Sequence, residues 1–289
     1  MPQFTKSPSQ FVVVSSVLAS LIYGSATLGP ALSAERAATP NFSPDSNTGW
    51  VPDRPTGDDF LAPFSGPGPI TSEKGHPYVP NGRGQPTYRI AELGNPILKP
   101  WVAERLKKAN DLVLAGKVPF SPRERCWPGG VPDFDIYTRV APIYFLQTAK
   151  EVTIIIELDH QVRHVYLNVP HSEHVTPSWY GESVGRYEGD ELVVDTIGLN
   201  DRTFVDNYNT PHTDKLHVVE RFKLVDGGKT LEVRVTVDDP DAFNMQWSAT
   251  QRWRRGEARP MTELSCAENN FGFLGYDVAP IPQADKPEF

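Results

Sequence analysis

The sequence predicts a mainly β protein whose antiparallel strands form a meander that closes into a barrel or a strongly curled sheet. Two observations predict this class. Apolar and polar side chains alternate with a period of two across residues 140–267, as in strands with one buried face. No helical segment separates the expected strands, and a long uncovered meander tends to remove its exposed edges by curling and closing. A sandwich of two sheets is the alternative.

Residues 1–34 have the pattern of a secretory signal peptide. A weakly basic start leads into a short apolar run that ends at Tyr23, and small residues follow it. Cleavage after Ala34 is favoured, with Ala26 and Ala31 as alternatives. The run is too short to span a bilayer, and no other segment is long and apolar enough. We therefore expect a periplasmic or secreted protein; a cytosolic protein with an apolar first strand is the alternative.

Between the signal peptide and the β region we expect an extended arm and one amphipathic helix. Residues 35–98 are rich in proline, which cannot donate to a regular ladder, so they are predicted to form an irregular wrap or linker. Residues 99–139 contain the helix and a connecting segment. The helix is predicted over 99–115, with an apolar stripe suited to packing on the outside of a sheet. The stripe consists of Val102, Leu106, Ala109 and Val113.

The β domain is assigned to residues 140–270, and residues 271–289 to a C-terminal tail. The expected strands are 142–148, 152–159, 163–169, 182–188, 191–198, 216–224, 229–237, 246–254 and 261–267. Tight turns are predicted at Gly189 and at the pair Gly227 and Gly228, where glycine and acidic residues separate two apolar runs.

Composition and cysteine content limit the classes of partner. The net charge of -8 argues against a nucleic acid or an anionic membrane as partner. The two cysteines, Cys126 and Cys266, are expected to form one disulfide in an oxidising compartment. Two thiols so far apart do not resemble a metal-binding motif.

Histidines point to the candidate site. Six of them lie between residues 160 and 217: His160, His164, His171, His174, His212 and His217. Imidazole exchanges protons near neutral pH, so this concentration favours acid–base chemistry. Three loop imidazoles could bind zinc, but their spacing is irregular, and we expect neither a metal nor an organic cofactor. His164 is expected to be a solvated strand residue.

Three polar side chains interrupt apolar rows that are expected to face inward. Glu220 shares its row with Val218 and Phe222, Asp195 lies between Val193 and Ile197, and His160 ends the row of Ile154 and Ile156. Burial raises the pKa of a carboxyl group toward the range useful for proton transfer. The alternative is that each acid forms a structural ion pair, for which the candidate partners are Arg186, Arg221 and Arg234.

One short motif is set aside. Residues 181–185 read Gly-Glu-Ser-Val-Gly, which fits the nucleophile elbow of serine hydrolases. An elbow needs a helix after the serine, whereas the residues that follow Ser183 predict a strand that enters a hairpin. A serine hydrolase is therefore not predicted.

The run 177–201, together with residues 211–212 and 216–222, resembles a large family of exported bacterial proteins of unassigned function. The similarity extends to residues 159–163 and to both cysteines. Members usually read Asp-Gly-Arg-Pro-His where this chain has Asn-Val-Pro-His at 168–171, and tryptophan in place of Tyr187. The resemblance implies no particular reaction. It gives emphasis to His160, His171, Asp195, Asn200, His212, His217 and Glu220.

The pattern favours an exported enzyme that performs lyase, isomerase or hydratase chemistry on an apolar or aromatic small molecule inside the barrel. The expected catalytic residues are His160, His171, Asp195, His212, His217 and Glu220. The expected substrate-binding residues are Tyr166, Trp179, Asn200, Trp247 and Trp253. A non-catalytic, lipocalin-like carrier is the alternative, since it would use the same interior with fewer polar groups. A third possibility is a scaffold that binds a partner through the Pro-rich arm.

Overall fold

The computed structural model describes residues 39–263 except 44, 46–47, 54–58, 76–78, 81–85, 118–125, 133–141 and 159. The predicted signal peptide, the C-terminal tail and Cys266 lie outside the described residues. The disulfide between Cys126 and Cys266 and the signal peptide therefore stay predictions. In the described part of the chain, no helix has the length and apolar character needed to cross a membrane.

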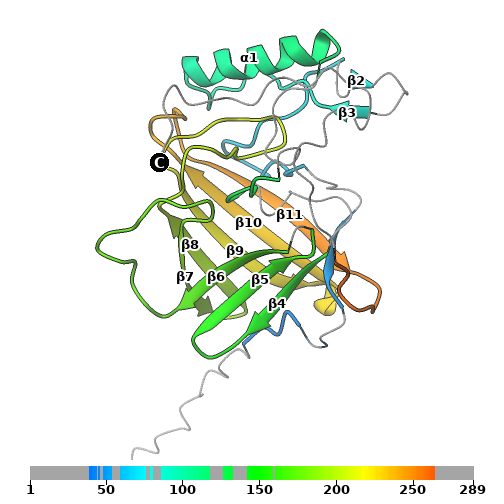
Figure 1. The fold of residues 1–289 in the computed structure, drawn as a ribbon, viewed down its shortest axis with the longest axis vertical. Coiled ribbons are helices and arrows are strands. Elements are labelled where there is room, and N and C mark those ends of the chain that lie inside the picture. The colour runs from blue at the N-terminus through cyan, green and yellow to red at the C-terminus, as the bar shows by residue number, and fades with distance from the viewer. Residues whose placement is uncertain are drawn as a thin grey trace, which may run out of the picture. The chain divides into compact units, whose positions relative to one another are not determined.

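The strands form a closed barrel of nine, in the order β1-β11-β10-β9-β8-β7-β6-β5-β4, which confirms the mainly β class (Figure 1). Its strands are β1 (Trp50–Pro52), β4 (Ile143–Gln147), β5 (Glu151–Ile156), β6 (Gln161–Leu167), β7 (Glu182–Glu188), β8 (Glu191–Ile197), β9 (His217–Val225), β10 (Thr230–Asp238) and β11 (Trp247–Arg255). A separate two-stranded sheet joins β2 (Val79–Pro80) to β3 (Pro86–Tyr88). A 3-10 turn at Asp226–Gly228 links β9 to β10.

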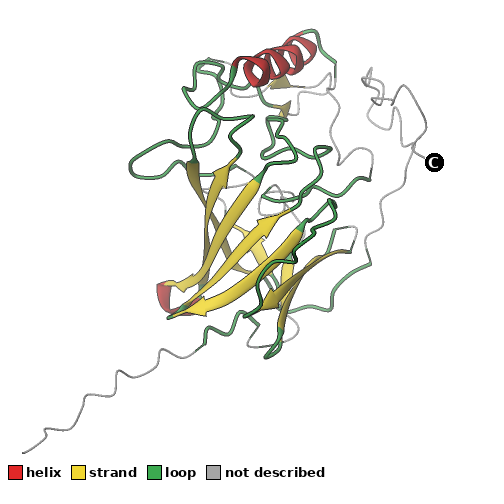
Figure 2. Cartoon of the chain, turned by 90° about the vertical axis from the view of Figure 1, so that its left-hand side faces the viewer, coloured by secondary structure: helices red, strands yellow, loops and turns green. Residues whose placement is uncertain are grey.

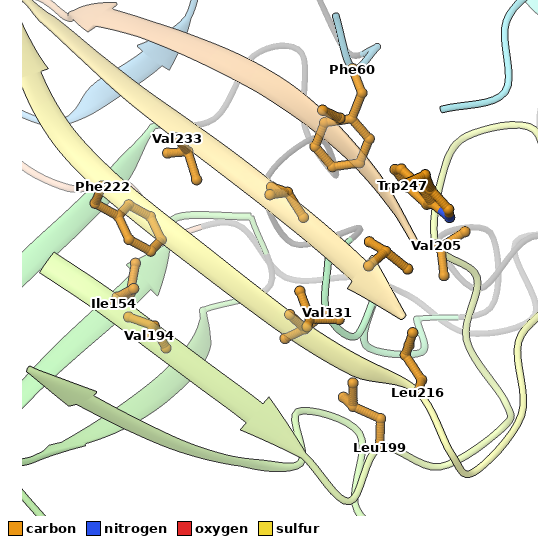
Figure 3. Close-up of a cluster of buried hydrophobic side chains, with 14 of the residues drawn as sticks. Phe60, Val131, Ile154, Val194, Leu199, Val205, Leu216, Phe222, Val233 and Trp247 are labelled. Carbon is orange, nitrogen blue, oxygen red and sulfur yellow. The ribbon is translucent and has the colours of Figure 1, made fainter. Parts of the chain in front are cut away.

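Inward-facing and outward-facing side chains alternate along the barrel strands, as expected. In β10, Val233 and Val235 are fully buried while Arg234 between them is exposed. Side chains from several strands converge on one hydrophobic core, in which Figure 3 shows Ile154, Val194 and Phe222 close together. Because inward rows from opposite strands fill the space between them, the interior around these residues is a packed core.

The strand that closes the barrel comes from the Pro-rich arm, which corrects the predicted strand order. β1 pairs with β11 on one side and with β4 on the other. Residues 261–263, the described part of the predicted strand 261–267, are not in a strand. β1 has only three residues and ends in Pro52, so it was too short for alternation to reveal. Trp50 anchors it, with its indole Nε1 donating to the Phe42 carbonyl oxygen at 2.8 Å.

One strand pair departs from the predicted antiparallel meander. β6 and β7 run parallel and pair only over Val165–Ser183, Tyr166–Val184 and Leu167–Gly185. The chain between them, residues 168–181, returns along the outside of the wall before β7 begins. At its end, Ser178 pairs with Leu199 instead of continuing along β6. The first residues of β6 and the chain leading into β7 therefore diverge, and we call this part of the wall the seam.

The predicted helix is α1 (Pro100–Leu114), which lies beyond one end of the barrel rather than on its side (Figures 1 and 2). Proline occupies its first turn, where no N–H partner is needed. Its buried stripe contains Asn110 in place of the expected Ala109. The Asn110 amide bonds the Ala91 backbone at both N–H and C=O, at 2.8 and 2.9 Å. The helix thus covers the arm and the β10–β11 loop, where the Trp101 indole donates to the Asp241 carbonyl oxygen at 2.8 Å.

Trp50→Ala tests whether the arm is part of the barrel. Trp50 is 1% exposed, so its loss should leave a cavity and lower the free energy of unfolding by about 3–5 kcal/mol in urea titrations. Trp101→Ala, on the partly exposed face of α1, is the matched control and should cost far less. Equal effects of the two substitutions would contradict the closing role of β1.

Candidate functional site

A pocket of about 440 Å³ opens at the seam. Residues of β6, of the 168–181 connection and of the start of β7 line it: Val162, Arg163, His164, Tyr166, His174, Val175, Thr176, Tyr180, Gly181, Glu182 and Ser183. Its volume is in the range of small-molecule sites. The described cavity thus lies between β6 and the chain leading into β7, and neither Trp247 nor Trp253 lines it.

Glu182 belongs both to this pocket and to a chain of hydrogen-bonded side chains on the outer wall. His171 Nδ1 lies 3.0 Å from Glu182 Oε1, and His171 Nε2 lies 3.0 Å from Asp195 Oδ1. His217 Nε2 lies 2.9 Å from the same Asp195 oxygen. Three of the predicted catalytic residues, His171, Asp195 and His217, are therefore brought together. They come from the connection, β8 and β9.

Both nitrogens of the His171 ring have a carboxylate partner. Both ring nitrogens face carboxylate oxygens, and an ionised carboxylate only accepts. Both contacts are hydrogen bonds when the ring carries two protons, as the imidazolium. The Ser172 hydroxyl and backbone N–H, and then His171, lower the pKa of Glu182 below its usual value. The cluster therefore fastens the connection to the wall beside the pocket.

Asp195 faces outward, which corrects the expectation that its row lines the interior. The inward row of β8 is Leu192, Val194 and Thr196, all fully buried. Residues 192–194 are all apolar, so apolar character could not distinguish the two faces of this strand. Asp195 owes its partial burial to His171 and His217 rather than to the core.

Glu220 faces inward as predicted, but it is ion-paired. Its two oxygens accept from Nη1 and Nη2 of Arg163 on β6, the first at 2.8 Å. Arg163 also donates to the hydroxyls of Ser183 at 3.2 Å and Thr196 at 2.8 Å. The expected partners Arg186, Arg221 and Arg234 lie on the outer face, where each contacts Glu188 or Glu191. The Arg163 end of this buried network borders the pocket.

A second imidazole–carboxylate pair joins His164 of β6, which lines the pocket, to Glu151 of β5. His164 Nδ1 lies 2.5 Å from Glu151 Oε1, which also accepts from the Thr153 hydroxyl at 3.0 Å. These bonds from His164 and Thr153 lower the pKa of Glu151. The His164 ring lies nearly parallel to Tyr166, with ring centroids 6.4 Å apart. The expectation that His164 is a solvated strand residue is confirmed, and its place at the pocket was not foreseen.

The remaining predicted residues are dispersed. His160 is exposed in the β5–β6 turn, with a positive φ of 48°, so it does not end an inward row. His212 is buried, with Nδ1 donating to the Thr213 carbonyl at 2.9 Å and Nε2 facing the Thr203 hydroxyl at 2.8 Å. Burial lowers the pKa of His212, so it serves as a neutral link within the 199–213 loop. Asn200 accepts from the Arg202 N–H in the same loop.

The predicted substrate-binding aromatic residues do not share one interior surface. Tyr166 is half exposed on the outer face of β6, and Trp179 is half-buried against Trp127, with ring centroids 5.3 Å apart. Trp247 and Trp253 are buried in the core. Within the described structure, neither indole N–H has a hydrogen-bond partner. Of this set, only Tyr166 lines the described pocket.

The motif at 181–185 is explained by packing. Ser183 is a buried strand residue bonded to Arg163 and Thr196, and no helix follows it. A side chain at Gly181 would place its Cβ 2.3 Å from the Ile197 carbonyl oxygen, and one at Gly185 would lie 2.7 Å from Val165. Both glycines allow close approach of neighbouring chain segments.

A second group of titratable residues lies away from the pocket. Asp206 is buried and accepts from Thr210 N–H and hydroxyl and from Tyr208 N–H. Burial raises its pKa to about 6. The Tyr208 hydroxyl contacts Ser72, and the Arg89 guanidinium lies over the Tyr208 ring at 6.0 Å. These contacts tie the 199–213 loop to the arm.

Sequence reasoning missed Arg163, Glu182 and Glu151. Arg163 shares its inward row with Val165 and Leu167, so the same parity test that singled out Glu220 would have found it. Glu182 and Glu151 begin strands on the outer face, and no sequence pattern marked them. Among the described residues, no group of three or more His, Cys, Asp or Glu side chains is arranged to hold a metal ion.

Comparison with known proteins gives no assignment. No family model, curated protein or solved structure matches the chain. The function must therefore be argued from the seam and its side chains.

The buried ion pair predicts opposite outcomes for single and double substitutions. Glu220→Gln removes the carboxylate charge that both guanidinium Nη atoms of Arg163 contact in the interior and should lower the free energy of unfolding by about 3–5 kcal/mol. Replacing both residues, with Arg163→Met and Glu220→Leu, removes both charges and should cost much less. Urea denaturation of the three proteins measures this difference. A double variant as unstable as the single one would contradict it.

Asp206 predicts a pH-dependent stability. Its folded pKa of about 6 lies above the usual value of about 3.9, so protonation favours the folded state and this contribution is lost as pH rises through 6. Relative to Asp206→Asn, the wild-type protein should lose up to about 3 kcal/mol between about pH 4 and about pH 7. Asp190→Asn, in the exposed β7–β8 turn, is the control. Parallel pH curves for wild type and Asp206→Asn would contradict the assignment.

Proposed function

We propose that this chain is an exported enzyme that transfers protons to and from a small molecule bound in the seam pocket. The observation that carries the proposal concerns Glu182. This residue lines the pocket, and its carboxylate also accepts a hydrogen bond from His171 Nδ1. Catalytic acids and bases are found in clefts beside groups that set their protonation state.

The lining favours a ligand with an aromatic or apolar part and a polar group. Val162 and Val175 supply apolar surface, and Tyr166 and Tyr180 supply aromatic rings. Polar groups from Thr176 and Glu182 lie among them. Pockets for small molecules combine apolar walls with a few placed polar groups in this way.

In the proposed step, the Glu182–His171 pair supplies a proton. The proton on His171 Nδ1 passes through Glu182 to the ligand, and His171 becomes the neutral imidazole that still donates from Nε2 to Asp195. Asp195 stabilises the cation before transfer, because its oxygen lies 3.0 Å from the ring nitrogen. His217 is a positioning residue that holds Asp195. After the ligand leaves, solvent restores the proton.

Deuterium exchange into a simple carbon acid tests this proposal. The probe is phenylacetone, an aromatic ketone with an acidic C–H, incubated with the protein in D2O and followed by NMR and mass spectrometry. We expect exchange above the buffer rate, and we expect Glu182→Gln to reduce it about 100-fold, the usual contribution of a positioned acid or base.

Glu188→Gln is the matched control. Glu188 lies on the same strand and is paired with Arg186 and Arg221 outside the pocket, so this variant should keep the wild-type exchange rate. Binding of phenylacetone without exchange would favour the carrier. Equal loss in both variants would show that the effect is not local to the pocket.

A further inference from the structure

We propose that His164, oriented by Glu151, is the base that works opposite the Glu182–His171 acid, so that the pocket acts on carbon acids. This inference rests on the proposed function of the seam pocket and adds its second catalytic group. It assigns a role to a histidine and a glutamate that sequence patterns did not select.

The geometry of the pair leaves one ring nitrogen for a ligand. Glu151 accepts at 2.5 Å from His164 Nδ1, so in the neutral ring Nδ1 carries the proton and Nε2 holds the lone pair. The described residues place no carboxylate on Nε2. His164 lines the pocket, and a histidine beside a cleft with one nitrogen held by a carboxylate has the arrangement of a general base.

Two neighbours fix the carboxylate and the ring. The Thr153 hydroxyl donates to the same Glu151 oxygen at 3.0 Å. Tyr166, two residues along β6, lies within 13° of the plane of the His164 ring. Since β5 and β6 are paired through Thr153–His164 and Glu151–Tyr166, all four side chains are carried by one rigid ladder.

The acid and the base stand on the neighbouring strands β7 and β6. His164 projects from β6, while Glu182 begins β7 and is held by the connection, and both line the pocket. The two strands pair from the next residue onward, at Val165–Ser183, so His164 and Glu182 lie side by side where the ladder begins. A ligand in the pocket can therefore lose a proton to one of them and gain one from the other.

This arrangement defines a reaction class that needs no oxidant or reductant. His164 Nε2 takes a proton from a carbon next to a carbonyl group, and the C–H electron pair forms a new C=C bond. In an unsaturated substrate, the electron pair of the existing C=C bond takes the Glu182–His171 proton at its far carbon, which gives an isomer. In a β-hydroxy substrate, the C–O bond breaks and the hydroxyl takes that proton and leaves as water. His164 then releases its proton to solvent. The substrate class is a small aromatic or apolar carbonyl compound.

The catalytic arm of the test uses the same phenylacetone exchange. His164→Asn should lower the exchange rate about 100-fold with an unchanged melting temperature, because the side chain is largely exposed. Lys150→Asn is the matched control, since Lys150 is also exposed but lies in the β4–β5 turn outside the pocket. It should exchange at the wild-type rate.

The orienting role of Glu151 is tested by determining the tautomer of His164 from long-range ¹H–¹⁵N NMR spectra. In the wild-type protein above neutral pH the proton should be on Nδ1, and in Glu151→Gln the Nε2–H form that free histidine prefers should appear. The same tautomer in both proteins, or wild-type exchange in His164→Asn, would overturn the inference. Loss of exchange in Glu182→Gln alone would leave the proposed function standing, whereas no exchange in the wild-type protein would sink both.

Discussion

The brief parallel pairing of β6 and β7 is the constraint on which the candidate site depends. An antiparallel hairpin at this position would have continued the ladder and closed the wall. Parallel strands instead require a connection that returns to the starting end, and here residues 168–181 make that return outside the barrel. Because Ser178 pairs with Leu199, the returning chain is drawn toward β8. The wall therefore opens where β6 begins, and the opening is lined from both sides.

Two ionic contacts keep this opening in shape. Outside, the His171 ring lies between Glu182 and Asp195 and fastens the connection to β7 and β8. Inside, Arg163 reaches from β6 to Glu220 on β9, and its bonds to Ser183 and Thr196 tie β6 to β7 and β8. A buried ion pair adds little stability over apolar residues of the same volume. Its value here is geometric, because it spans the seam where strand pairing is absent.

The sequence predicted the barrel more fully than the site. Strict alternation with a polar outer row, as in β10, determined which side chains face inward. Alternation failed in β8, where Val193 is apolar on the outer face, and so Asp195 was assigned to the wrong side. β1 was missed because a strand of three residues is too short to show the alternation of apolar and polar side chains. The parallel pair could not be predicted, because residues 168–181 have no pattern that distinguishes a return connection from a hairpin loop.

The two imidazole–carboxylate pairs of the pocket differ in one physical respect, and that difference divides their roles. His171 contacts a carboxylate at each ring nitrogen, and in the proposed reaction it is the proton source. Among the described carboxylates, His164 contacts Glu151 alone, and in the proposed reaction its other nitrogen accepts the proton. Environments that push two similar groups toward opposite protonation states assign the acid and the base of a site. The number of carboxylates around each ring, rather than the histidines themselves, is therefore the basis of the proposed direction of proton transfer.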